Sequence, residues 1–209
     1  SKAELDAVMK NLENVSYLVD EVKKGERVKK APIPFTTSTM QQEASKALNF
    51  STQKTMRLAQ QLYEGVEVKG HGTIGLITYL RTDSTRIAEE ADAAARAFVK
   101  EHYGENYMAA GEPAKKNAGK IQDAHEAIRP TDISLTPVMV KESLPRDLFR
   151  LYQLIWKRFA ASRMAPAVYE TTMVKIRGGN QLFSAAASRL SFDGFMSVYV
   201  DADDEEEKG

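Results

Sequence analysis

Apolar side chains recur every three or four residues in several stretches of the chain, a spacing that is typical of amphipathic helices. Helices are therefore expected over Ala3–Leu12, Ser38–Leu48, Ser51–Gly65, Ser84–His102, Val138–Glu142 and Pro145–Met164. A capping box between Ser38 and Gln41 is expected to begin the second of these helices. The middle of the chain is thus expected to be mostly helical.

The last third of the chain changes to a two-residue alternation, which favours strands. Strands are expected over Tyr169–Ile176, Gln181–Ala187 and Phe195–Val200, with turns at Gly178–Asn180 and Asp193–Gly194. The β-prone residues Tyr17–Val19 are able to join the same antiparallel unit, and a basic turn is expected to follow them at Lys23–Lys30. A separate short strand or extended segment is expected over Thr73–Tyr79.

Two prolines divide the chain after its first strand. Pro32 and Pro34 lack backbone donors and bias the residues before them toward extended geometry, so neither a helix nor a strand continues through them. The sequence predicts a mixed α+β fold, in which a helical, helix-turn-helix-like domain is inserted into a small antiparallel β domain. The expected parts are a first β-rich segment 1–33, a helical domain 34–164 with a surface loop at 104–122, a second β-rich segment 165–200 and an acidic tail 201–209.

Charge is distributed unevenly along the chain although its sum is zero. The 29 basic residues balance 29 acidic ones, but the acidic tail alone holds Asp201, Asp203, Asp204 and three glutamates. Residues 1–200 consequently carry a formal charge of +5. A mildly basic body is compatible with a nucleic-acid partner, whereas a terminal block of one sign is typical of a solvated tail or a linker.

Composition excludes several classes of protein. No apolar run approaches the roughly 20 residues of a membrane-spanning helix, so no membrane partner is expected. The absence of cysteine excludes disulfides, thiolate metal sites and cysteine nucleophiles from this chain, and it fits a reducing compartment. The chain opens on Ser-Lys-Ala without an initiator methionine or a signal peptide, so a piece of a larger protein is expected.

Reactive side chains gather between Tyr79 and Ser84, at the exit of an expected strand. A tyrosine phenol, with an ordinary pKa of about 10, needs nearby positive charge or a base to act as a nucleophile. Arg81 supplies such a charge and suits bidentate contact with a phosphate. In the structural alternative, Arg81 and Asp83 form a surface ion pair, Tyr79 packs, and Thr82 or Ser84 caps the next helix.

A second polar cluster runs from Asp123 to Thr131. His125 is suited to act as a general acid or as a hydrogen-bond donor to phosphate, with Asp123 or Glu126 orienting it. A metal site is not expected here, because no further histidine lies nearby and a single histidine among polar residues is more often a hydrogen-bonding group.

The helices at 38–48 and 51–65 resemble a helix-turn-helix, whose second helix can enter a groove of DNA. Lys54 and Arg57 on that second helix would then contact phosphates. Helical hairpins are also common in proteins that do not bind DNA, and both side chains are equally explained as part of a solvated face.

Three segments together resemble successive signatures of the type IA DNA topoisomerases. They are PFTTSTMQQEA at Pro34–Ala44, YLRTDS at Tyr79–Ser84 and DAHEAIRP at Asp123–Pro130. Their order and spacing also match this family. Leu80 stands where the topoisomerase III branch typically carries proline, so the chain is more similar to bacterial topoisomerase I.

The resemblance implies that Tyr79 attacks a phosphodiester of single-stranded DNA, forms a 5′-phosphotyrosyl link and releases a 3′-hydroxyl. A second strand would pass through the break before it is resealed, so that negatively supercoiled DNA relaxes without ATP. Arg81 would position the scissile phosphate, and His125 would contact phosphate. The other candidates for contact with DNA are Asp83, Thr82, Ser84, Arg129, Lys54 and Arg57. A cytoplasmic enzyme of the bacterial nucleoid is implied.

Two family features have no counterpart in the sequence. The toprim domain, which would supply a catalytic Glu, a Lys and the acidic Mg²⁺ ligands, is not found, so the chain is expected to be inactive alone and to need that domain as a partner. Zinc ribbons are excluded because the chain has no cysteine. A non-catalytic DNA-binding module, an interaction domain and the topoisomerase half of reverse gyrase remain alternatives.

Overall fold

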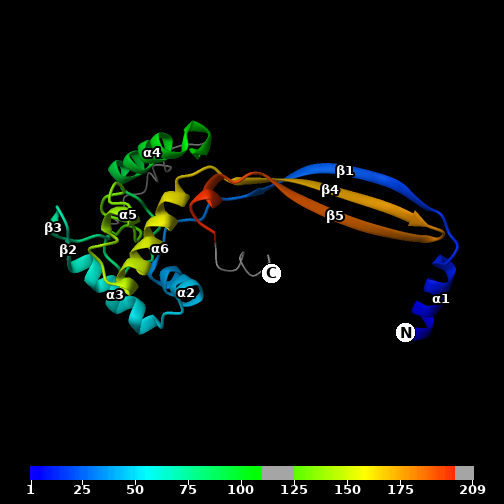
Figure 1. Cartoon of the computed structure of the whole chain (residues 1–209), viewed down its shortest axis with the longest axis horizontal. Helices are drawn as coiled ribbons and strands as arrows, with labels where there is room; N and C mark the ends of the chain where they lie inside the picture. Colours follow the sequence, from blue (N-terminus) through cyan, green and yellow to red (C-terminus); the bar gives the residue numbers. More distant parts are fainter. Residues whose placement is uncertain (110–124, 201–209) are drawn as a thin grey trace. The chain divides into compact units, whose positions relative to one another are not determined.

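The computed structural model describes residues 1–109 and 125–200, which form two compact units (Figure 1). Unit 1 comprises Ser1–Lys29 and Ala167–Asp193, and unit 2 comprises Lys30–Pro166 and the described residues from Gly194 onward. Unit 1 is mainly strand and unit 2 mainly helix, so the predicted mixed α+β fold is confirmed.

Unit 1 is an antiparallel sheet preceded by a helix. Its elements are α1 (Lys2–Leu12), β1 (Tyr17–Lys29), β4 (Ala167–Gly178) and β5 (Gln181–Phe192), with the strand order β1-β4-β5. Gly179 and Asn180 form the tight turn between β4 and β5, and Gly179 has the positive φ of +57° that such turns favour. The expected basic turn at Lys23–Lys30 is wrong, because β1 pairs with β4 as far as Lys29 and these residues continue the strand.

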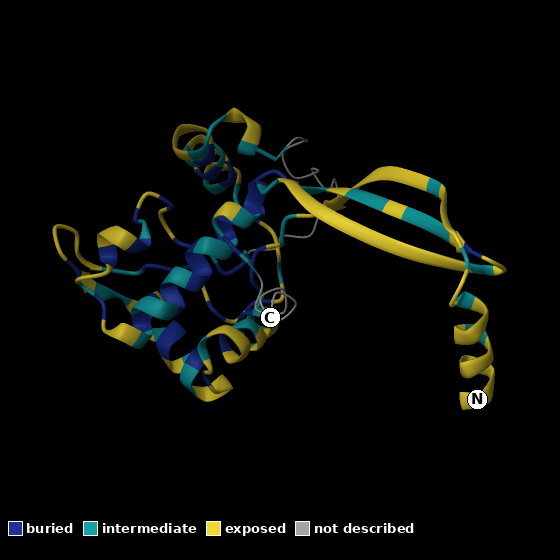
Figure 2. Cartoon of the chain, turned by 45° about the vertical axis from the view of Figure 1, so that its right-hand side comes forward, coloured by how far each residue is buried: buried dark blue, intermediate teal, exposed yellow. Residues whose placement is uncertain are grey.

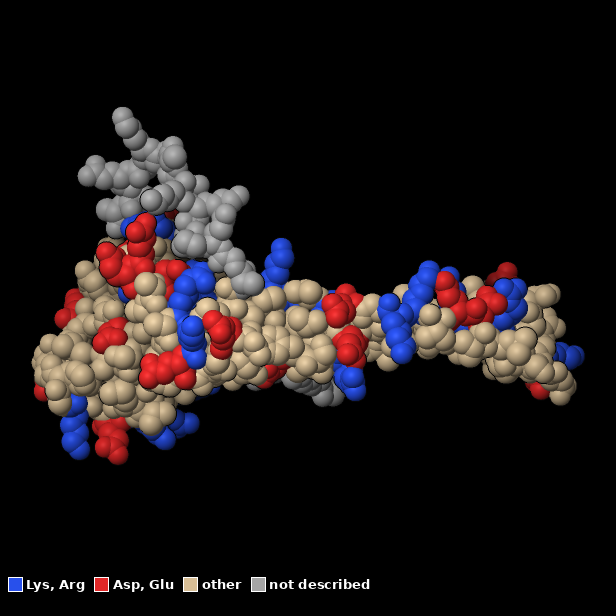
Figure 3. All heavy atoms as spheres, turned by 90° about the horizontal axis from the view of Figure 1, so that it is seen from above, with Lys and Arg blue, Asp and Glu red and all other residues tan. Residues whose placement is uncertain are grey.

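Acidic and basic side chains are interspersed on the sheet of unit 1 (Figure 3). Arg177 lies 2.8 Å from the Asp20 carboxylate and Lys175 lies 2.9 Å from that of Glu21, both across the β1–β4 pair. The hydrogen bond from Arg177 holds the pKa of Asp20 below its ordinary value, and the one from Lys175 does the same for Glu21. These exposed pairs balance the charge of the sheet locally.

Unit 2 is built around one long buried helix. Its elements are α2 (Thr37–Leu48), α3 (Thr52–Glu64), β2 (Val66–Val68), β3 (Gly72–Ile74), α4 (Glu89–Tyr103), η1 (Glu105–Tyr107), α5 (Pro137–Val140), α6 (Arg146–Ser162) and η2 (Gly194–Ser197). Helix α6 contacts α2, α3 and α5, and it contributes the largest share of buried residues (Figure 2). Buried polar atoms on α6 are satisfied, since the Tyr152 hydroxyl donates to the Leu135 carbonyl at 2.6 Å and the Trp156 indole donates to the Ile133 carbonyl at 2.9 Å.

Three expected element boundaries in unit 2 are wrong. Helix α2 begins earlier than expected, because Thr36 and Thr39 form the capping box in place of Ser38 and Gln41. Helix α4 begins at Glu89 rather than at Ser84, since the carbonyl of Arg86 accepts a hydrogen bond from the Ala127 backbone and draws this stretch away from helical geometry. The short strand or extended segment expected over Thr73–Tyr79 is a strand only as far as Ile74, which pairs with Val66, the first residue of β2.

The expected strand over Phe195–Val200 is also wrong. Residues 194–197 form the short helix η2, and the backbone N–H of Phe195 donates to the Ala165 carbonyl at 2.9 Å. Phe195 and Tyr199 are buried and lie four residues apart, a spacing that suits a helical turn. This stretch therefore belongs to unit 2, although it was expected in the second β-rich segment. Of the expected surface loop, Glu105–Tyr107 form η1, and residues 110–122 lie outside the described part, as does the acidic tail.

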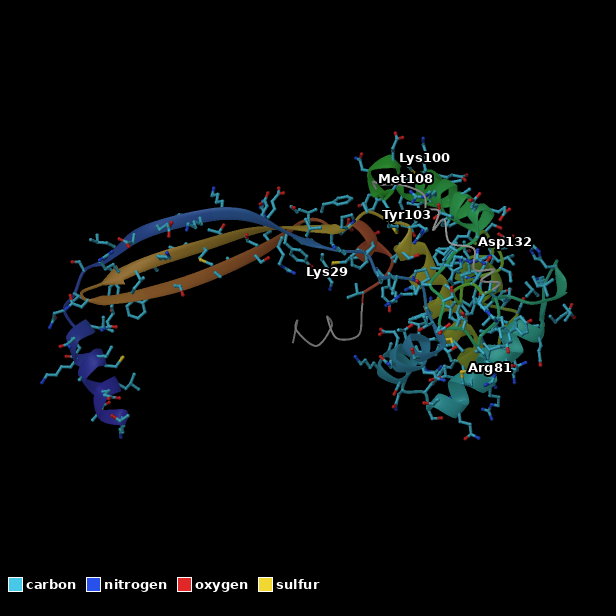
Figure 4. The ribbon with its side chains drawn as sticks, turned by 180° about the vertical axis from the view of Figure 1, so that it is seen from behind. Lys29, Arg81, Lys100, Tyr103, Met108 and Asp132 are labelled. Carbon is cyan, nitrogen blue, oxygen red and sulfur yellow. The ribbon has the colours of Figure 1, made fainter. Side chains whose placement is uncertain are left out.

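A buried ion-pair cluster ties α4 to the end of α6. The Asp92 carboxylate accepts from Arg163 at 2.6 Å and from Arg96 at 2.8 Å. Arg96 also donates to the Ala109 carbonyl, one residue beyond Met108 in Figure 4. Burial alone would raise the pKa of Asp92, but hydrogen bonds and charge from the two arginines outweigh it and hold the pKa below its ordinary value.

Replacing Asp92 by alanine is expected to lower the free energy of unfolding by about 3 kcal/mol, because two partly buried guanidinium groups lose their carboxylate. With the folded-state pKa depressed, the contribution is fully present above the unfolded pKa of about 4 and is lost as pH falls through the folded value. Urea unfolding between pH 7 and pH 3 checks this, since the difference between wild type and Asp92→Ala should shrink below about pH 4. Asp147→Ala is the control, because its pair with Lys54 is more exposed and its loss should lower the free energy of unfolding by clearly less. Equal losses of unfolding free energy in Asp92→Ala and Asp147→Ala would contradict the stabilising role given to the Asp92 cluster.

Candidate active site

Burial alternates strictly between Tyr79 and Asp83. Leu80 and Thr82 point into unit 2, with 0% and 9% of their surface exposed, whereas Tyr79, Arg81 and Asp83 are exposed. The two inward side chains anchor the segment and leave the other three exposed. The segment therefore displays both the phenol and the guanidinium to solvent.

Backbone contacts fix the stretch before Tyr79 to the second polar cluster. The Thr78 N–H donates to the Arg129 carbonyl at 2.9 Å, and the Thr78 hydroxyl donates to the Ala127 carbonyl at 2.7 Å. Ile77 forms an isolated antiparallel bridge with Pro130, and both residues are buried. The YLRTDS and DAHEAIRP signatures, which lie far apart in the sequence, are thus held side by side.

The same stretch is pressed against the end of α3. The Leu76 N–H donates to the Leu62 carbonyl at 2.7 Å, and a Cβ atom on Gly75 would meet the Tyr63 carbonyl oxygen at 2.6 Å. Only glycine permits this approach without displacement of one backbone. As a result the ring of Tyr63 lies edge-on to that of Tyr79, with the ring centroids 5.4 Å apart.

An open hollow of about 450 Å³ brings the three signatures together. Its lining residues are Thr37 and Ser38 from the first signature, Arg81, Thr82 and Asp83 from the second, and His125 from the third. Arg81 projects from unit 2 in Figure 4. Arg81, His125 and the N-terminal end of α2, which carries a partial positive charge, face this hollow, and the Asp83 carboxylate lies among them. The arginine and the free N–H groups of the helix are groups that bind phosphate, whereas Asp83 would oppose it.

The structural alternative for this cluster fits only in part, since Tyr79 does pack against the ring of Tyr63. No ion pair joins Arg81 to Asp83 in the part of the chain that the structure describes, and Tyr79 keeps 44% of its surface exposed. Neither Thr82 nor Ser84 caps α4, whose N-cap is Ala88. The Thr82 hydroxyl instead accepts from the Ser84 N–H at 3.1 Å and closes a local turn.

Two residues of the second polar cluster, Glu126 and Arg129, form an ion pair with each other. Arg129 binds the Glu126 carboxylate through two nitrogens at 2.8 and 2.7 Å, and it also donates to the Pro130 carbonyl. Glu126 therefore braces Arg129, and Arg129 is suited to holding this loop in shape. That Glu126 or Asp123 orients His125 stays a prediction. Asp123 lies outside the described residues.

The candidates on α3 lie away from the hollow's lining. Lys54 is 2.6 Å from the Asp147 carboxylate and stacks on the buried ring of Phe50 at 4.2 Å, contacts that fasten α3 to the start of α6. Arg57 is exposed on the same helix. A role in phosphate binding stays a prediction for both, and the geometry gives Lys54 a structural explanation.

Sequence reasoning missed Thr37, Ser38 and Tyr63. The first two lie inside the PFTTS signature, so a signal was present, but the signature itself assigns no role to either side chain. Tyr63 contacts Tyr79 only because Gly75 permits the close approach described above, and no local pattern indicates that contact.

Metal ligands are not gathered in the described residues. Within 1–109 and 125–200 no group of three or more His, Asp or Glu side chains is placed to hold an ion. Asp83 is the only carboxylate lining the hollow, so these residues do not fit a Mg²⁺ site. In the same ranges no helix is both long and apolar enough to cross a membrane.

The helical unit thus carries an exposed tyrosine, and the arginine two residues after it lines the hollow together with a histidine from another signature. A sequence model of the DNA topoisomerase family matches residues 1–209. Full-length topoisomerase I from Thermotoga maritima has a similar structure, with a TM-score of 0.79 and 41% sequence identity over 92% of this chain. The chain belongs to the type IA DNA topoisomerases. It spans 31% of the Thermotoga enzyme, about a third of its length.

Proposed function

We propose that this chain supplies the nucleophile and part of the phosphate site of a topoisomerase that relaxes negatively supercoiled DNA. The observation that carries the proposal is the placement of Arg81 and His125 in one hollow, with Tyr79 exposed two residues before Arg81. The two signatures that supply these residues are held together by hydrogen bonds from Thr78. Membership of the family supports it.

In the proposed reaction the Tyr79 hydroxyl oxygen attacks the phosphorus of a single-strand phosphodiester. A bond between this oxygen and phosphorus forms, the bond between phosphorus and the 3′-oxygen breaks, and the phenol's proton is balanced by protonation of the departing 3′-oxygen. Arg81 binds the non-bridging oxygens, on which negative charge develops, and His125 donates to the same phosphate. The reverse attack by the 3′-hydroxyl reseals the strand after strand passage. No phosphodiester is lost overall, so no ATP is required.

The remaining groups would come from outside this chain. A toprim domain of the same full-length enzyme would supply a catalytic Glu, a Lys and the carboxylates for Mg²⁺, an ion that would neutralise phosphate charge when bound. Because these groups are not found in the sequence, we expect the chain to be inactive alone. The enzyme would act in the cytoplasm, on DNA of the bacterial nucleoid.

The proposal is tested in a mixture of this chain, a separately expressed toprim-containing piece and Mg²⁺. The substrate is single-stranded DNA that carries a label at its 3′ end only. A 5′-phosphotyrosyl link retains the 3′-labelled part of the strand, so a labelled band at the size of this chain should survive denaturant. Peptide mapping should place the nucleotide on Tyr79. Omission of the toprim piece should remove the band.

Two negative results would point elsewhere. A 5′-labelled oligonucleotide retained in place of the 3′-labelled one would contradict the proposed polarity. Binding that weakens steeply with salt, without any adduct, would favour the non-catalytic DNA-binding module, because phosphate contacts alone give a salt-dependent affinity.

A further inference from the structure

The first signature has no part in the reaction described so far, yet it contacts both of the others. The Phe35 carbonyl accepts from the Ile128 N–H at 2.8 Å, three residues after His125. Two residues along the chain, the Thr37 N–H donates to the Thr82 carbonyl at 2.9 Å. The short stretch 35–37 thus joins the His125 segment to the Arg81 segment.

Thr37 binds the backbone on both sides of Arg81. Its hydroxyl lies 2.7 Å from the Leu80 carbonyl and 3.0 Å from the Thr82 carbonyl, and it accepts from the Thr82 N–H at 2.8 Å. The Leu80 carbonyl and the Thr82 N–H belong to the two peptide planes that flank the Cα atom of Arg81. Because each peptide unit is planar, fixing both planes fixes φ and ψ of Arg81.

The position of Thr37 in its helix explains why one residue can make all these bonds. Thr37 is the first residue of α2, where the backbone N–H has no partner within the helix and is free to bind the Thr82 carbonyl. A hydroxyl offers one proton and two lone pairs, so the backbone contacts use most of its capacity. Thr37 is therefore suited to hold Arg81 rather than to bind a phosphate itself.

We infer that Thr37 is a positioning residue for the cleavage step, which it serves by fixing the backbone from which the Arg81 guanidinium reaches the hollow. This inference rests on the proposed function. Arg81 is a long, exposed side chain, and a fixed backbone reduces the range of directions that its charged end has to search. The first signature thereby acquires a role in the reaction.

Thr39 offers a matched control on the same turn of α2. Its hydroxyl accepts from the Thr36 N–H at 2.9 Å and completes the capping box, but no hydrogen bond links it to residues 80–82 in the described structure. Loss of the Thr39 hydroxyl weakens the capping box at the start of α2, whereas loss of the Thr37 hydroxyl removes bonds to the backbone on both sides of Arg81.

The test uses the full-length topoisomerase that contains this chain, with single-turnover cleavage of a labelled oligonucleotide at saturating DNA. Thr37→Val should lower the cleavage rate by about 100-fold, because small displacements of a catalytic group have effects of this size. Thr37→Ser, which keeps the hydroxyl, should restore the rate, and Thr39→Val should cleave like wild type. Oligonucleotide affinity should change little in all three variants.

A double-mutant cycle separates positioning from general stability. If Thr37 acts through Arg81, Thr37→Val should cost little further rate in an Arg81→Ala background. Should Thr37→Val unfold at the assay temperature, Thr37→Cys takes its place in the cycle, since a thiol of similar size is a weaker donor and acceptor.

The outcomes distinguish this inference from the proposal beneath it. If the wild-type enzyme cleaves DNA but Thr37→Val and Thr39→Val lower the cleavage rate equally, Thr37 is not a positioning residue. Fully additive effects of Thr37→Val and Arg81→Ala on the rate would overturn the inference as well. A wild-type enzyme that forms no adduct would overturn the proposed function instead.

Discussion

Replacing Tyr79 by phenylalanine is expected to abolish the covalent adduct completely. The substitution removes one oxygen atom, the only atom of this side chain that can form a bond to phosphorus. The ring contact with Tyr63 and the buried anchors Leu80 and Thr82 remain in place, so folding should be unaffected. Single-stranded DNA should still bind, because Arg81 and the rest of the hollow are unchanged.

Tyr63→Phe is the matched control for this variant. Tyr63 is exposed to a similar extent as Tyr79, 40% against 44%, and its ring touches that of Tyr79. It lies on α3 rather than beside Arg81 in the sequence, so removal of its hydroxyl should leave the adduct intact. Denaturing electrophoresis of both variants with 3′-labelled DNA is the measurement. An adduct that persists in Tyr79→Phe, or that vanishes in Tyr63→Phe, would contradict the assignment of the nucleophile.

Replacing Arg81 by alanine is expected to slow cleavage by about 10² to 10³-fold, the usual effect of removing one group that stabilises developing negative charge. Arg81→Lys should recover part of this loss, since an ammonium group keeps the charge but cannot bind two phosphate oxygens in a fork. The measurement is the single-turnover rate of adduct formation in the full-length enzyme.

Arg86 provides the control for loss of a positive charge near the site. Its side chain is partly exposed and lies 4.0 Å from the Glu126 carboxylate, but it does not line the hollow. Arg86→Ala should therefore reduce DNA affinity slightly and leave the cleavage rate near that of wild type. Equal rate losses in Arg81→Ala and Arg86→Ala would reduce the role of Arg81 to that of a general surface charge.

The sequence predicted the helices with a strong apolar periodicity more closely than the elements whose limits depend on distant partners. Helix α6 matches its expected extent because its buried residues recur at helical spacing throughout. Strand β1 was expected to end early, since Lys23–Lys29 carry little apolar signal and become a strand through pairing with β4, about 140 residues away. Phe195–Val200 was misassigned because two aromatic residues four apart fit both a short strand and a helical turn.

In the candidate site, too, local sequence features were predictable, whereas contacts with distant residues were not. The signatures single out Tyr79, Arg81 and His125 without any structure, and the hollow gathers two of them. The ion pairs of Arg129 and Lys54 were not predictable, because a side chain in a single sequence does not indicate which distant or neighbouring carboxylate it will meet. The bonds from Thr37 to the Arg81 backbone depend on tertiary packing for the same reason.

The close approach at Gly75 limits how this part of the chain can vary during evolution. Any side chain there begins with a carbon atom that would lie 2.6 Å from the Tyr63 carbonyl oxygen, and backbone would have to move to make room. Tyr79, the proposed nucleophile, follows four residues later on the same stretch, so the displacement would carry its side chain with it. A substitution at residue 75 therefore requires a compensating shift of the backbone at Tyr63, the end of α3 that it contacts. Residue 75 and the end of α3 should accordingly change together in evolution or not at all.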